Sequence, residues 1–118
     1  MNRDLQIFGT TVLLLILFDL PWLLLIGETA QTMILKIQGS ELSLRMAPAL
    51  VVYLALAYLV SKAESVAEAF KMGVAVYAVY DFTNYAMFKK YTLQFALLDS
   101  LWGGILMALT KAALNRIF

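Results

Sequence analysis

An uninterrupted apolar run from Leu5 to Ile26 is the feature that most constrains how this chain folds. It is as long as the roughly 20 residues that an α-helix needs to cross the hydrocarbon core of a bilayer. Three further apolar segments follow, over about 42–61, 66–88 and 93–114, with short polar stretches between them. We therefore predict an all-α protein, a four-helix transmembrane bundle that forms a single integral membrane domain over residues 1–118.

The composition supports a membrane protein and excludes several functions. Hydrophobic residues make up 63% of the chain and charged residues 14%, against about 45–50% and about 25% in soluble domains. The net charge of +1 provides no basic surface for a nucleic acid. The absence of Cys and His excludes disulfides, thiolate chemistry, the common zinc ligands and hydrolase triads. We predict a lipid bilayer as partner, with no enzymatic activity, cofactor or metal site.

A cleaved signal peptide is the alternative interpretation of the first run, because Arg3 precedes it. The length of the run, the presence of Asp19 and Pro21 within it, and the poor cleavage site after it all favour a retained membrane helix over about 5–26. We expect residues 27–40 to form a connector, in which Met33–Ile37 lies at the membrane interface.

Local signals indicate where the other helices begin and end. Arg45 and Pro48 lie in the first turns of the second segment, so a helix beginning near Ala47 is an alternative to one beginning at 42. Ser65–Glu68 matches a capping box and predicts the start of the third helix. The short stretch Lys89–Tyr91 predicts a tight turn, and therefore an antiparallel hairpin of the last two helices.

Three aspartates, Asp19, Asp81 and Asp99, lie inside the apolar segments. An ionised carboxylate in this position costs several kcal/mol, and the central parts of these helices contain no Lys or Arg to compensate. The three side chains are therefore either protonated or visited by a cation. Counting along the predicted helices at about 1.5 Å per residue places all three roughly 10 Å inside the same membrane face. We expect them to share one layer.

Each aspartate has a polar or amphipathic neighbour three residues later, on the same helical face: Trp22, Asn84 and Trp102. The candidate proton- or ion-binding core is Asp19, Asp81, Asn84 and Asp99. Its expected supporting residues are Trp22, Tyr77, Tyr80, Thr83 and Trp102. We assign Tyr53, Tyr58, Tyr85 and Tyr91 to packing or to anchoring at the interface. The segments 19–22 and 99–102 share an Asp-Leu/Ser-Pro/Leu-Trp pattern, which is too short to demonstrate a duplication.

Two of these motifs resemble a known family. The segments Tyr80–Asn84 and Leu98–Gly103 resemble the third- and fourth-helix motifs of short four-helix membrane proteins grouped as domain of unknown function number 2177. Asp19 with Trp22 resembles the first-helix motif of that family, and Pro21 within it is a departure. The turn differs as well, because Tyr91-Thr92 replaces an expected Trp-Pro-like pair. The resemblance covers nearly the whole chain and implies a membrane protein without an assigned activity.

Two functions remain open at this point. In the first, a small transporter or channel binds a proton or another cation at the aspartate layer, and a homo-oligomer forms the pathway because four short helices enclose little space. In the second, the protein is a non-catalytic structural or assembly subunit of a membrane complex, and the aspartates are hydrogen-bonding groups that hold the helices together. A membrane enzyme in which the three acids hold a divalent metal is a third class, which lacks any motif for a reaction.

Overall fold

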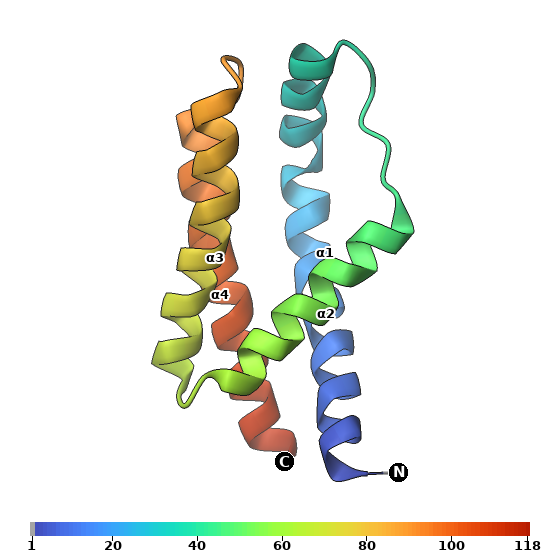
Figure 1. Cartoon of the computed structure of the whole chain (residues 1–118), viewed down its shortest axis with the longest axis vertical. Helices are drawn as coiled ribbons and strands as arrows, with labels where there is room; N and C mark the ends of the chain where they lie inside the picture. Colours follow the sequence, from blue (N-terminus) through green and yellow to red (C-terminus); the bar gives the residue numbers. More distant parts are fainter. Residues whose placement is uncertain (1) are drawn as a thin grey trace.

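A computed structural model describes residues 2–118 of the chain as four α-helices with short connections (Figure 1). The helices are α1 (Arg3–Gln38), α2 (Met46–Lys62), α3 (Val66–Met87) and α4 (Leu93–Ile117). Both termini lie at one end of the molecule, which we call the terminal end; the last turns of α1 and the α3–α4 connection lie at the other end, the turn end (Figure 1). The predicted all-α bundle is confirmed.

The first helix is longer than predicted. It does not end at Ile26 but continues to Gln38, and Gly39, with φ 77°, terminates it by donating its N–H to the carbonyl of Leu35 at 2.9 Å. The predicted connector over 27–40 is therefore wrong, because a single glycine costs a helix only about 1 kcal/mol. Met33 compensates for this cost by packing against the α3–α4 connection.

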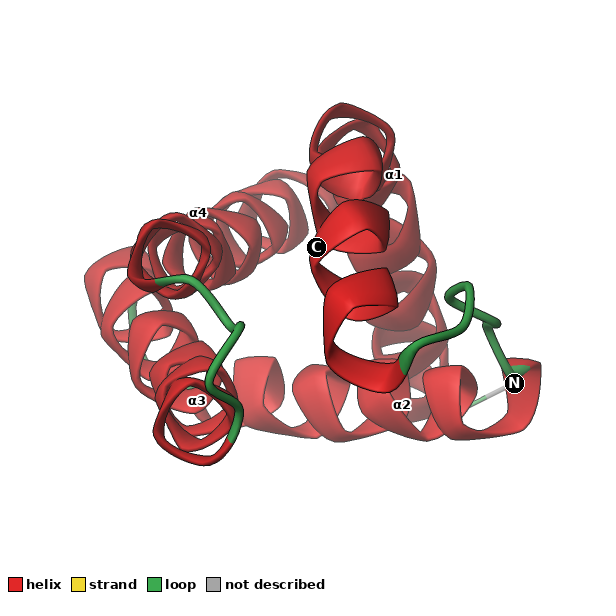
Figure 2. Ribbon diagram, turned by 90° about the horizontal axis from the view of Figure 1, so that it is seen from above, coloured by secondary structure: helices red, strands yellow, loops and turns green. Residues whose placement is uncertain are grey.

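The second helix is shorter than the predicted segment 42–61 and is strongly inclined. It begins at Met46, in agreement with the shorter alternative, and Pro48 falls in the first turn, where its missing N–H costs little. Residues 39–45 form a loop that returns from the turn end toward the middle of the molecule (Figure 1). Seen along the long axis, α2 runs across the other helices (Figure 2).

The predicted hairpin of α3 and α4 is confirmed and is the most extensive helix pair in the structure. Ser65 caps the start of α3 as predicted, because the Glu68 N–H donates to Ser65 Oγ at 3.0 Å. The Glu68 carboxylate accepts from the N–H of Glu64 at 3.1 Å and not from that of Ser65, so the reciprocal bond of a capping box is shifted by one residue. The two helices approach closely where Gly73 faces the backbone of Gly103 and Gly104. This contact places the middle of α3 directly against the middle of α4.

Two helices of residues 2–118, α1 and α4, are long enough and apolar enough to cross a bilayer, and α2 is apolar but shorter. The prediction of four spanning helices is thus supported for two. The outer face of α1 carries exposed leucines, among them Leu24, which is 83% exposed. A continuous apolar face of this kind is rare in water and is suited to lipid.

Two apolar clusters divide the interior along the long axis. One contains Leu15, Val60 and Met107, and the other contains Met33 and Ala96 with the α3–α4 connection. Buried Asp19 and Asp99 come between these clusters in the sequences of α1 and α4. The polar layer is therefore enclosed by hydrophobic packing on both sides.

The glycine contact between α3 and α4 yields a stability prediction. A methyl group on Gly73 meets the backbone carbonyl of Gly103, which cannot move aside as a side chain can. Gly73→Ala should therefore lower the free energy of unfolding by about 1–3 kcal/mol or more, measured by chemical unfolding in detergent micelles. Gly9→Ala is the matched control, because nothing lies within 4 Å of the added carbon. An equal loss for both variants would contradict this account of the contact.

Candidate functional site

The centre of the molecule contains a reciprocal pair of Asp–Trp hydrogen bonds between α1 and α4. Trp22 on α1 donates its indole N–H to Asp99 Oδ1 on α4 at 3.0 Å, and Trp102 on α4 donates to Asp19 Oδ1 on α1 at 2.8 Å. The two indole rings stack, with centroids 5.4 Å apart and planes 12° from parallel. Each tryptophan thus donates a hydrogen bond to the aspartate of the opposite helix.

The direction of the two helices explains this exchange. In both segments the tryptophan follows the aspartate by three residues, so the two side chains lie on one face about one turn apart. Because α1 and α4 run in opposite directions, the tryptophan of each helix lies level with the aspartate of the other (Figure 1). The sequence placed each tryptophan beside the aspartate of its own helix, but each tryptophan donates its hydrogen bond to the aspartate of the other helix.

Asp19 has a second donor from α2. The hydroxyl of Tyr53 donates to Asp19 Oδ2 at 2.5 Å, so both carboxyl oxygens of Asp19 accept a hydrogen bond. Only 6% of the Asp19 side chain surface is exposed. Hydrogen bonds to a charged group contribute about 1.5–3 kcal/mol each, and here they join α1 to both α2 and α4.

Asp81 on α3 is fully buried and is held from the turn end. The Tyr91 hydroxyl donates to Asp81 Oδ1 at 2.6 Å, and Ser100 lies at 3.5 Å from Oδ2. Tyr91 is in the connection between α3 and α4, outside the helices. Burial raises the pKa of its hydroxyl, and the hydrogen bond to Asp81 acts in the same direction. The hydroxyl therefore stays protonated and remains a donor.

The carboxyl groups of Asp81 and Asp99 are close neighbours, because Ser100, the residue next to Asp99, lies 3.5 Å from Asp81 Oδ2 and the two acids interact electrostatically. Two ionised carboxylates that lie close together repel each other in a low-dielectric interior, and a proton bonded between them removes that repulsion. Trp22 can only donate, so the Asp99 oxygen that it contacts must accept. The other oxygen of Asp99 is not engaged by Trp22.

Within the described residues, 2–118, no basic side chain is a hydrogen-bonding partner of these acids. Across residues 2–118, the donors to the three carboxyl groups are tryptophan, tyrosine and serine side chains. In the same part of the chain, no buried side-chain nitrogen or oxygen lacks a hydrogen-bonding partner. The layer of three aspartates is thus acidic and enclosed, and its buried polar atoms find their hydrogen-bonding partners within the chain.

Of the other predicted residues, Tyr77 is at the layer, Asn84 and Tyr80 are at its edge, and Thr83 is outside it. Tyr77 covers Gly103 and is close enough to all three aspartates to interact electrostatically with them. Asn84 lies beside Tyr80 and Tyr91 and donates to none of the three carboxyl groups. Tyr80 is 60% exposed, and Thr83 is exposed too.

Three partners of the aspartates were missed by the sequence analysis, namely Tyr53, Tyr91 and Ser100. The two tyrosines were assigned to packing or anchoring, whereas each donates to a buried carboxyl group. Ser100 follows Asp99 directly and, about 100° further round α4, lies against Asp81. The one available signal was that a buried tyrosine hydroxyl requires a polar partner.

The geometry does not assemble the three acids into a metal site. Among residues 2–118, no group of three or more acidic, histidine or cysteine side chains is arranged to hold a metal ion. Two surface cavities, one at each end of the molecule, are lined by residues other than these aspartates. The arrangement is suited instead to holding a proton between two carboxyl groups.

These features define a helical membrane protein with a buried acidic core. Comparison with known protein families matches residues 5–114 to a family described as "Predicted membrane protein (DUF2177)". The chain belongs to this family, which confirms the resemblance based on its helix motifs. No curated protein and no solved structure matches the chain.

The hydrogen bond to Asp19 yields a second prediction. Tyr53→Phe keeps the ring but removes the donor, leaving a buried carboxyl oxygen unpaired, and should lower the free energy of unfolding by about 1–3 kcal/mol. The matched control is Tyr58→Phe on the same helix, because Tyr58 is 56% exposed and bonds to no aspartate. Chemical unfolding in micelles measures both. Equal stability of the two variants would refute the structural role of the Tyr53 hydroxyl.

Proposed function

We propose that this membrane protein binds a proton at the Asp81–Asp99 pair and couples its binding and release to proton or cation movement across the bilayer. The observation that supports the proposal is the proximity of two buried carboxyl groups whose hydrogen-bond donors are all uncharged. Intramembrane acids commonly mark proton relays and ion pathways. The proposal assigns no catalytic reaction to the chain.

A proton is better suited to this pair than a metal cation. One proton bonded between two carboxyl groups removes their repulsion, whereas Ca²⁺ takes about six to eight oxygen ligands and Mg²⁺ about six. The outer oxygens of the pair are already engaged by Trp22 and Tyr91. A metal ion would have to displace these donors.

Loss of the proton from the Asp81–Asp99 pair changes contacts in the rest of the bundle. Without it, Asp81 on α3 and Asp99 on α4 repel each other, and Asp99 also holds Trp22 on α1. A shift of Asp99 therefore acts on the stacked indoles and, through Trp102, on Asp19. Protonation at one point in this way biases the packing of three helices.

The proposed transport pathway involves several helices and more than one copy of the chain. Because α3 lies antiparallel along α4, which is long and apolar enough to span, we propose that α3 crosses the membrane beside it. The aspartate layer is enclosed within one chain, so a continuous pathway is better placed between copies in a homo-oligomer. The exposed leucine face of α1 is available for such contacts.

A second function is favoured by a different observation. Asp19 is bonded on both oxygens by donors from two other helices, as expected of a group that only fixes helix packing. On this basis the protein is a structural or assembly subunit of a membrane complex. The two functions differ in what the Asp81–Asp99 proton does, and charge-neutral substitution separates them.

Proton flux in vesicles tests the proposal. The full-length protein is reconstituted with a pH-sensitive dye inside, and flux is measured after a pH step for wild type, Asp81→Asn and Asp99→Asn. Because an amide still forms hydrogen bonds, both variants should stay within about 1 kcal/mol of wild-type stability. They should nevertheless lose the flux, since an amide has no proton to release in this pH range.

Glu41→Gln is the matched control, because it makes the same carboxyl-to-amide change in the exposed loop after α1. Its flux should equal that of wild type. Wild-type flux in both aspartate variants would reject proton coupling at this pair. A wild-type protein that is folded but conducts no protons would reject transport and favour the structural function.

A further inference from the structure

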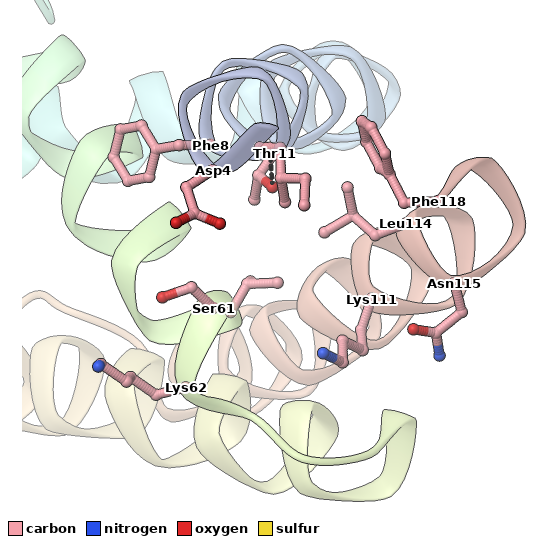
Figure 3. A pocket seen from close by; sticks show the side chains of 11 residues that line it. Asp4, Phe8, Thr11, Ser61, Lys62, Lys111, Leu114, Asn115 and Phe118 are labelled. Atoms are coloured by element: carbon pink, nitrogen blue, oxygen red, sulfur yellow. Dashed lines mark hydrogen bonds between the residues drawn. The ribbon is translucent and has the colours of Figure 1, made fainter. Parts of the chain in front are cut away.

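A cavity of about 880 Å³ opens at the terminal end of the molecule between α1, α2 and α4. Figure 3 shows side chains of all three helices surrounding an open space. Its volume lies within the range of about 300–1,000 Å³ that is typical of small-molecule sites. The cavity is separate from the aspartate layer, because none of the three aspartates lines it.

The inner part of the cavity is apolar. Thr11, Val60 and Leu114 lie behind its wall with little accessible surface of their own, at 2%, 0% and 8% exposure. The partly exposed side chains of Ile7, Phe8 and Phe118 provide its apolar surface. The Thr11 hydroxyl donates to the carbonyl of Ile7 at 2.7 Å within its own helix, so it offers the cavity mainly its methyl group. Phe8 adds an aromatic side chain to the wall.

The outer part of the cavity is polar and carries more positive than negative charge. Lys62 at the end of α2, Lys111 on α4 and Asp4 at the start of α1 all contribute to its lining. The Lys62 ammonium also lies 5.3 Å from the centroid of the Tyr58 ring, which helps to hold it at this end. Arg3, whose guanidinium lies over Phe118, adds a further positive charge nearby.

The shape of the bundle explains why the space is not filled by the chain itself. The inclined α2 crosses α1 and ends at Lys62, and the last residues of α2 line the cavity together with residues from the start of α1 and the end of α4 (Figure 1). At the end of a membrane-spanning bundle, water or lipid must occupy such a space. An apolar interior with a cationic rim matches an amphiphile that has a hydrocarbon chain and a negative headgroup.

We propose that this cavity binds an anionic phospholipid, with the phosphate at Lys62 and Lys111 and part of one acyl chain against Ile7, Phe8 and Phe118. The site is independent of proton binding at the Asp81–Asp99 pair. Lipid binding bridges α1, α2 and α4 at the end where these helices diverge, and it therefore stabilises the fold.

Thermal unfolding of the full-length protein in detergent micelles tests the proposal. Phosphatidylglycerol should raise the midpoint temperature in a saturable way, whereas phosphatidylcholine at the same mole fraction should not. Lys62→Gln and Lys111→Gln should each weaken the apparent affinity by about tenfold, because each removes one charged contact to the phosphate. Lys89→Gln, at the opposite end of the molecule, is the matched control and should bind as wild type does.

Two further measurements identify what occupies the cavity. Ser61→Phe keeps both lysines but fills the space from an exposed position on its rim, so it should abolish stabilisation by phosphatidylglycerol. Inorganic phosphate should neither stabilise the protein nor compete with the lipid. The proposal is overturned by equal stabilisation with phosphatidylcholine, by phosphatidylglycerol binding to Ser61→Phe, or by inorganic phosphate reproducing the lipid effect.

Discussion

Burial of three carboxyl groups among apolar helices is the constraint on which the structure depends. Each group costs several kcal/mol in this environment unless donors compensate it. The chain supplies those donors from other elements, with indoles exchanged between α1 and α4 and tyrosine hydroxyls from α2 and the α3–α4 connection. The positions of all four helices are tied to these contacts, so the polar layer specifies the fold as well as forming its candidate site.

The proximity of Asp81 and Asp99 sets one place in this layer apart. Asp19 accepts hydrogen bonds from two other helices, whereas Asp81 and Asp99 are close enough to interact with each other. The same side chains therefore hold the bundle together and provide a position where protonation changes the forces between helices. Helix packing and the proposed proton binding would thus both depend on the same side chains.

Local features of this structure could be predicted from the sequence, because neighbouring residues determine them. The cap of α3 at Ser65, the tight connection after α3 and the polar character of the three aspartates all follow from residue type and spacing. Features that depend on contacts across the bundle could not. Gly27 lies inside α1 because Met33 packs onto a distant turn, and the Asp–Trp exchange requires the rotation of α1 against α4. Spacing alone leaves that rotation undetermined.

The order in which the donors of Asp19 are synthesised has a consequence for how the helices assemble. Tyr53 follows Asp19 by 34 positions in the chain and Trp102 by 83, so Asp19 is synthesised before either of its partners. The Asp19 carboxyl group therefore has both of its hydrogen bonds only once α2 and α4 have packed against α1.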